Sequence, residues 1–174
     1  MKRIGIVLAL LFISMLPFRG ECGEVEGIGA GGDEDAPTRF PAGAFTPMLG
    51  ASVIGYDDSV LGGVTLGGGY YVIDRLELFA TGTVYFGDAT MLSVDPGAQW
   101  IFWETRYFAP YLKARGGPFF DLSGDNGTSW TAFGGGGAYI FAGNLFGVKL
   151  GGLAGYIIGD TKTFAWLLDL GLMF

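Results

Sequence analysis

The chain has 174 residues, half of them hydrophobic, and it contains 33 glycines together with 15 phenylalanines, 8 tyrosines and 4 tryptophans. After residue 17, no apolar run reaches the roughly 18 residues of a transmembrane helix, so the apolar content needs another explanation. Histidine is absent and Cys22 is the only cysteine, which excludes an internal disulfide. Beyond Cys22, sixteen acidic residues stand against seven basic ones, a net charge of −9. This balance disfavours nucleic-acid binding, which requires a basic surface.

Residues 1–22 are predicted to be an export signal. A positively charged start precedes an apolar core at 4–16, which is too short for a membrane-spanning helix. Cleavage is expected before Gly23, and two alternatives stay open: lipidation of Cys22, or a buried N-terminal helix. Residues 23–43 are acidic and glycine-rich and have little apolar surface, so they are predicted to form a flexible leader.

From Phe45 onward the sequence alternates with a period of two and is interrupted by turn residues, which indicates β-strands. The predicted strands cover 44–56, 59–72, 76–86, 92–102, 107–120, 130–141, 145–157 and 163–174. Each is long enough to cross a bilayer, since a tilted strand needs about 9–11 residues.

Bulky apolar residues occupy one face of these segments, and glycine, threonine or charged residues occupy the other. In the third segment, Leu78 and Val84 alternate with Glu77 and Thr83. The glycine run 134–137 leaves the facing of the sixth segment undefined.

Unpaired strand edges are not tolerated in lipid, so the sheet is expected to close on itself. The sequence therefore predicts an all-β fold, a closed antiparallel up-and-down transmembrane β-barrel of eight strands over residues 44–174. A soluble ligand-carrying barrel is the alternative, but it would need an apolar interior and a polar exterior.

Aromatic residues are predicted to form two girdles, as bilayer interfaces favour. The first girdle comprises Trp100, Trp103, Tyr107 and Phe108. The second comprises Tyr85, Phe86, Phe119, Phe120, Trp130, Tyr156, Phe164 and Trp166.

The last segment is the most regular. Its outward face is expected to carry Trp166, Leu168, Leu170, Leu172 and Phe174. With the strand count, this ending resembles the OmpA/OmpX-like group of small eight-stranded outer-membrane barrels. The resemblance implies an outer-membrane location and a C-terminal signal that the barrel-assembly machinery reads. It does not imply one function, because the group includes adhesins, membrane anchors and small-molecule passages.

No catalytic, cofactor or metal site is predicted. Serine nucleophiles usually need a histidine base, and the chain has none. The adjacent acids Asp57 and Asp58 are interpreted as solvated loop residues. The glycine run lacks the lysine and helix of a phosphate-binding loop.

Charged residues on the predicted inner face are the candidate functional site. They comprise the acids Glu77, Asp95 and Asp169 and the bases Lys113, Arg115 and Lys149. Because unpaired buried charges are costly, we expect them to neutralise one another and fill the lumen. A gated polar pathway is the alternative interpretation.

Hairpin geometry predicts which of these charges meet. A turn near Glu104 would place Asp95 beside Arg115 or Lys113, and a turn near Gly159 would place Lys149 opposite Asp169.

The sequence thus predicts a non-enzymatic outer-membrane protein with a structural or surface role, and a narrow pore is the alternative. Expected partners are outer-membrane lipids, lipopolysaccharide and the assembly machinery, and the protein is expected to be a monomer. Short turns at Asp74, Glu104 and Gly143 should face the periplasm, with loops near Asp58, Ala89, Asp125 and Asp160 outside.

Overall fold

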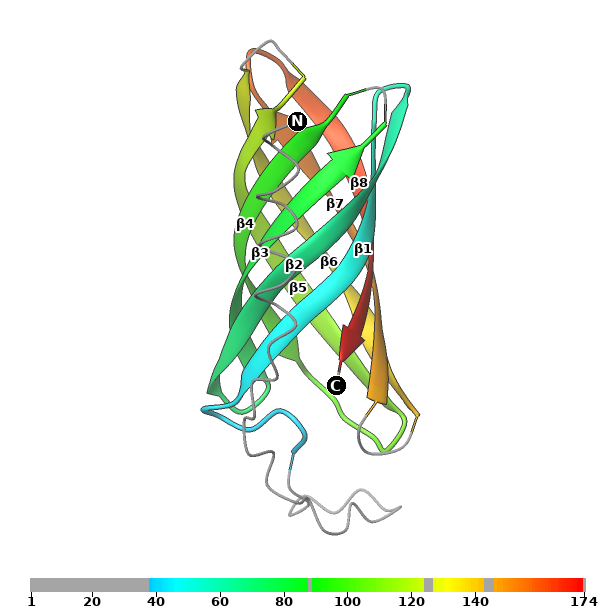
Figure 1. The fold of residues 1–174 in the computed structure, drawn as a ribbon. Helices are drawn as coiled ribbons and strands as arrows, with labels where there is room; N and C mark the ends of the chain where they lie inside the picture. Colours follow the sequence, from blue (N-terminus) through cyan, green and yellow to red (C-terminus); the bar gives the residue numbers. More distant parts are fainter. Residues whose placement is uncertain (1–37, 88, 124–126, 143–145, 174) are drawn as a thin grey trace, which may run out of the picture.

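The computed structural model describes residues 38–87, 89–123, 127–142 and 146–173. They form a closed barrel of antiparallel strands in which chain neighbours pair and β1 pairs with β8 (Figure 1). The strands are β1 (Phe45–Tyr56), β2 (Ser59–Ile73), β3 (Leu76–Phe86), β4 (Met91–Ile101), β5 (Phe108–Asp121), β6 (Thr128–Ala142), β7 (Phe146–Ile158) and β8 (Lys162–Met173). The predicted eight-stranded fold is confirmed. The predicted signal peptide and most of the leader lie outside the described residues.

Apolar side chains cover the outside of the barrel. Val60, Phe45 and Trp130 expose 62%, 61% and 59% of their surface, and residues of this kind occur on every strand from β1 to β8. Such an exterior is far larger than the apolar patches of soluble proteins, and it is the surface that strands in hydrocarbon require. The polarity is opposite to that of a soluble ligand-carrying barrel, which argues against that alternative.

Two residues assigned to the aromatic girdles lie inside the barrel instead. Tyr85 and Phe119 are buried and pack edge to face, with ring centroids 5.9 Å apart. Both occupy inward positions of their strands, whereas the outward neighbour Phe86 is exposed. The girdle prediction was wrong for these two residues because it considered how close they lie to the strand ends and not whether their side chains point inward or outward.

The barrel interior has three layers. An apolar cluster lies near the β1–β2 and β7–β8 turns, and Ile54, Tyr85 and Leu167 belong to it. A second apolar cluster near the opposite end includes Tyr71 and Tyr139. Threonines, serines and charged residues fill the space between the two clusters, and most of them are buried. In the described chain, no helix is long and apolar enough to span a membrane.

The glycine run in β6 makes room for a large side chain. Gly137 pairs with Gly151 of β7, and a Cβ atom on either residue would collide with the Tyr111 hydroxyl. Tyr111 uses the space to donate a hydrogen bond to the carbonyl oxygen of Leu150 at 3.1 Å. The run therefore serves packing, and its facing follows the same alternation as the other strands.

Candidate functional site

Five of the strands supply the charged residues of the middle layer. Strict alternation turns the side chains inward from β3, β4, β5, β7 and β8, and each is buried or nearly so. The residues are Glu77, Asp95, Lys113, Arg115, Lys149 and Asp169.

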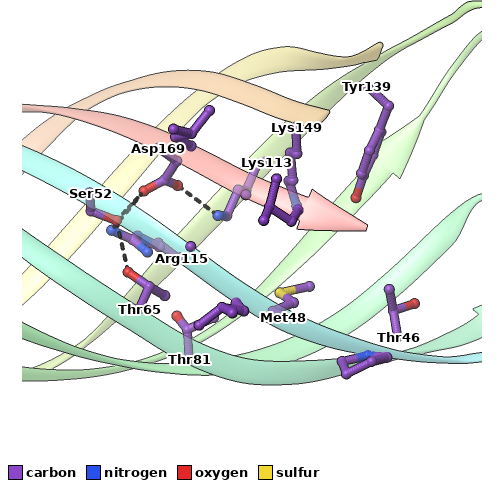
Figure 2. A pocket seen from close by; sticks show the side chains of 16 residues that line it. Thr46, Met48, Ser52, Thr65, Thr81, Lys113, Arg115, Tyr139, Lys149 and Asp169 are labelled. Atoms are coloured by element: carbon purple, nitrogen blue, oxygen red, sulfur yellow. Dashed lines mark hydrogen bonds and ion pairs between the residues drawn. The ribbon is translucent and has the colours of Figure 1, made fainter. Parts of the chain in front are cut away.

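Asp169 is the centre of the ion pairs in this layer. Lys113 Nζ donates to its Oδ2 atom at 2.8 Å, and Arg115 Nη2 lies 3.7 Å from its Oδ1 atom (Figure 2). The hydroxyl of Ser52 donates to the same Oδ1 atom at 2.8 Å. One carboxylate thus accepts hydrogen bonds from Lys113 and Ser52 and attracts a guanidinium, an arrangement expected to hold it ionised.

A row of hydroxyl groups extends from Asp169 across three strands. Ser52 of β1 is hydrogen-bonded to Thr65 of β2 at 2.9 Å, and Thr65 to Thr83 of β3 at 2.9 Å. Each hydroxyl can both donate and accept, so the row continues the hydrogen bonding from a charged group into the wall of the barrel.

The predicted pairing of Asp95 with Arg115 or Lys113 was wrong. Arg115 lies opposite Gly97, and Asp95 accepts a hydrogen bond from Thr131 Oγ1 at 2.8 Å. Ile101 pairs with Tyr111, so the pairing of β4 with β5 is centred near residue 106 and not between Glu104 and Thr105. The register shifts accordingly, although the inward facing is unchanged.

The predicted pairing of Lys149 with Asp169 was also wrong. Lys149 lies opposite Gly171, and Asp169 lies opposite Gly151. Lys149 Nζ instead sits over the rings of Tyr111 and Tyr139, at 4.9 and 5.2 Å from their centroids. Within the described part of the chain, this ammonium has no hydrogen-bond partner.

A pocket of about 50 Å³ lies beside the charged layer, and its lining also includes outward-facing residues of β1 and β8 such as Leu49 and Leu170. Lys113, Arg115 and Lys149 line it together with Asp169, so three cationic groups face one carboxylate there. Figure 2 shows these side chains converging on the same interior space from different strands.

A short segment before β1 closes one end of the barrel, which sequence reasoning missed. Phe40 is only 1% exposed, and its ring lies 5.2 to 6.1 Å from the rings of Tyr71, Tyr139 and Phe141. An aromatic residue inside an acidic, glycine-rich stretch was the available signal. We refer to residues 38–43 as the N-terminal cap.

Hydrogen bonds from two turns hold the N-terminal cap. Glu104 accepts from Thr38 Oγ1 at 2.7 Å and from the Arg39 backbone N–H at 3.0 Å. Asp74 accepts from the Ala42 backbone N–H at 2.7 Å. These contacts correct the prediction of a flexible leader for residues 38–43, because an apolar anchor and paired backbone groups order the segment.

Arg39 completes the N-terminal cap. Its guanidinium carbon lies 4.2 Å from the centroid of the Phe141 ring, a cation–π distance. Burial lowers the pKa of Arg39, and the nearby Glu104 carboxylate opposes that shift. Two turn carboxylates that sequence reasoning left without a role, Asp74 and Glu104, therefore bind the cap.

The residues of β8 that were predicted to belong to the assembly signal form a row on the outside of the barrel, which we call the outward row of β8. Trp166, Leu168, Leu170 and Leu172 are all exposed on the barrel exterior, whereas Phe174 lies outside the described residues. Recognition of this row by the barrel-assembly machinery stays a prediction.

The weak catalytic candidates have structural roles. Asp57 and Asp58 form the two-residue turn between β1 and β2, and Asp57 has a φ of 47°, which hairpin turns of this length favour. Among the described residues, no group of acidic side chains is arranged to hold a metal ion.

Comparisons with known proteins find no matching family model and no matching curated protein. Among solved structures, the chain is similar to Neisserial surface protein A, with 19% identity and a TM-score of 0.60 over 74% of this chain and 95% of that one. It is also similar to the N-terminal β-barrel domain of OprF from Pseudomonas aeruginosa, with 19% identity and a TM-score of 0.52 over 74% and 97% of the two chains. At these identities the likeness concerns the fold. The chain therefore has the fold of the small eight-stranded outer-membrane β-barrels.

Proposed function

We propose that this protein is a non-enzymatic integral outer-membrane barrel that acts as a closed structural or surface-interaction element of the envelope. The observation that carries the proposal is the three-layered interior, in which apolar clusters at both ends enclose a charged middle layer. An eight-stranded barrel is just wide enough to be filled by side chains, so such an interior leaves no continuous water path.

The exterior supports a membrane location. Large apolar side chains face outward along every strand, and an unpaired sheet edge is avoided by the pairing of β1 with β8. The predicted export signal, the shared fold and the outward row of β8 together favour the outer membrane and delivery by the barrel-assembly machinery.

The end of the barrel opposite the N-terminal cap favours a surface role. A hollow of about 330 Å³ lies there, and Asp57, Asp121 and Asp160 line it above an apolar floor that includes Phe119. Polar and acidic groups at this rim favour contact with water and with the head groups of outer-membrane lipids such as lipopolysaccharide.

Conductance measurements test the closed barrel against the narrow pore. The purified protein, reconstituted in planar bilayers, should show no stable unitary conductance, whereas a porin inserted under the same conditions should conduct. Steady unitary currents from the intact chain would overturn the closed-barrel proposal in favour of the pore.

A further inference from the structure

The connection between β4 and β5 and the strand ends beside it carry a patch of exposed aromatic side chains. We call this set the rim patch, and it comprises Trp100, Phe102, Trp103, Tyr107 and Phe108. The rings of Trp100 and Phe102 have centroids 6.3 Å apart, and those of Trp103 and Phe108 are 6.5 Å apart. The rim patch continues the lipid-facing exterior to the end of the barrel, the level at which bilayers favour tryptophan and tyrosine.

Two accessible arginines accompany the rim patch. Arg106 is exposed, and its guanidinium carbon lies 5.4 Å from the centroid of the Tyr107 ring. Arg75 belongs to the β2–β3 turn, and its carbonyl oxygen accepts a hydrogen bond at 2.9 Å from the N–H of Ile101, the last residue of β4. The side chain of Arg75 is 42% exposed. Both guanidinium groups can therefore reach the head-group level beside the aromatic rings.

Positive charge is in excess at this end of the barrel. The N-terminal cap and the described turns carry three arginines, Arg39, Arg75 and Arg106, against two acids, Asp74 and Glu104. Both acids accept hydrogen bonds from the backbone of the cap. The Oε2 atom of Glu104 lies 3.8 Å from Arg75 Nε, which is too far for a hydrogen bond. Among the described residues, Arg106 has no carboxylate within ion-pair distance, and its charge repels that of Arg39.

We propose that Arg75, Arg106 and the rim patch bind the phosphate of an anionic phospholipid in the membrane leaflet on this side, which we expect to be periplasmic. The inference rests on the membrane location in the proposed function and goes beyond it by naming a preferred lipid. Guanidinium groups form charge-assisted, bidentate hydrogen bonds with phosphate. The acyl chains would lie along the exterior below the rim patch, where Leu112 is exposed opposite Trp100. A lipid with net negative charge is favoured over a zwitterionic one, because the excess arginine repels an ammonium group.

Native mass spectrometry of the full mature chain in a non-ionic detergent tests the lipid preference. With phosphatidylglycerol and phosphatidylcholine of the same acyl chains supplied at equal concentration, the barrel should retain phosphatidylglycerol and much less phosphatidylcholine. Arg75→Gln and Arg106→Gln should each weaken phosphatidylglycerol binding about fivefold, the contribution of one arginine near an anionic membrane surface. Both side chains are accessible and neither lies within a strand, so the variants are expected to fold.

Lys162→Gln is the matched control. Lys162 is also exposed and also lies over a tyrosine ring, with its Nζ atom 3.9 Å from the centroid of Tyr156, but it belongs to the opposite end of the barrel. This variant should bind phosphatidylglycerol as tightly as the unmodified chain. An equal loss in the lysine and arginine variants, or equal retention of the two lipids by the unmodified chain, would overturn the proposal.

The segment 23–37 is the competing occupant of the arginines, since it carries five acids and no base. If this segment covered them, the unmodified chain would retain neither lipid, and the proposal would be overturned as well. None of these outcomes affects the closed-barrel proposal, because conductance measures that property separately.

Discussion

Asp169 stabilises the charged layer through contacts with three other residues, the cations Lys113 and Arg115 and the hydroxyl of Ser52. Asp169→Asn would leave both cations buried without their counter-charge. We expect the barrel to lose about 3–5 kcal/mol of unfolding free energy, and less if water enters. Denaturant unfolding in detergent micelles measures this loss.

The same experiment has a matched control and a rescue. Asp160→Asn changes an exposed acid and should leave the midpoint unchanged. Adding Lys113→Met to Asp169→Asn should recover part of the loss, because it removes a cation that has lost its partner. An unchanged midpoint for Asp169→Asn would contradict the central place given to this carboxylate.

The sequence predicted which side chains point into the lumen, but it did not predict which of the charged side chains contact one another. Alternation alone places Asp95, Lys149 and Asp169 in the lumen, because a strand has a fixed period of two. Which charges meet depends on where each hairpin turns, and a longer turn moves every pair along the strand. The ion pair between Lys113 and Asp169 joins β5 to β8 across the lumen. Local sequence patterns carry no information on which residues meet across the lumen.

At the scale of elements, the N-terminal cap makes a separate prediction. Phe40→Ala should release residues 38–43, because the ring that packs on Tyr71 and Tyr139 is their apolar anchor. Trypsin should then cleave after Arg39 in the variant, whereas the unmodified barrel should be protected there. Mass spectrometry of the digested barrel in detergent reads the new N-terminus.

The control for this cleavage is Phe45→Ala, which removes an aromatic ring that is exposed on the barrel exterior. Protection of Arg39 should persist in that variant. Equal cleavage of all three proteins would show that the N-terminal cap does not depend on Phe40.

The last strand has its own test. Deleting Phe174 should reduce the amount of protein in the outer membrane, because the sequence predicts this aromatic residue to be part of the assembly signal. Phe164→Ala removes an exposed ring near the start of β8 and should have a smaller effect. Quantitative blotting of membrane fractions compares the two, and equal abundance in all strains would refute the signal.

The strands were predictable from the sequence, but the N-terminal cap was not. Each strand alternates between inward and outward side chains over more than ten residues, so the pattern stays recognisable despite a few irregular positions. The cap consists of a single aromatic residue and a few backbone hydrogen bonds, which distant turns complete. Asp74 and Glu104 resemble ordinary turn residues in the sequence, and only the closed barrel places them beside the N-terminal cap.

At the scale of the whole molecule, the prediction concerns orientation. The N-terminal cap and the turns at Asp74 and Glu104 lie at the end of the barrel where β1 begins and β8 ends, and we expect this end to face the periplasm. Single cysteines at Asp58 and Asp160 should react with a membrane-impermeant maleimide on intact cells. A cysteine at Asp74 should react only after the cells are broken, and the reverse pattern would invert the topology.

The N-terminal cap also has a consequence for the order of folding. Its contacts reach the β2–β3 turn, the β4–β5 connection and the end of β6, so its binding surface does not exist until those strands lie side by side. The residues that lead the barrel along the chain are therefore among the last to reach their final positions. Interactions formed this late slow unfolding more than they speed folding. We therefore expect the cap to lengthen the lifetime of the assembled barrel and to contribute little to the rate at which it assembles.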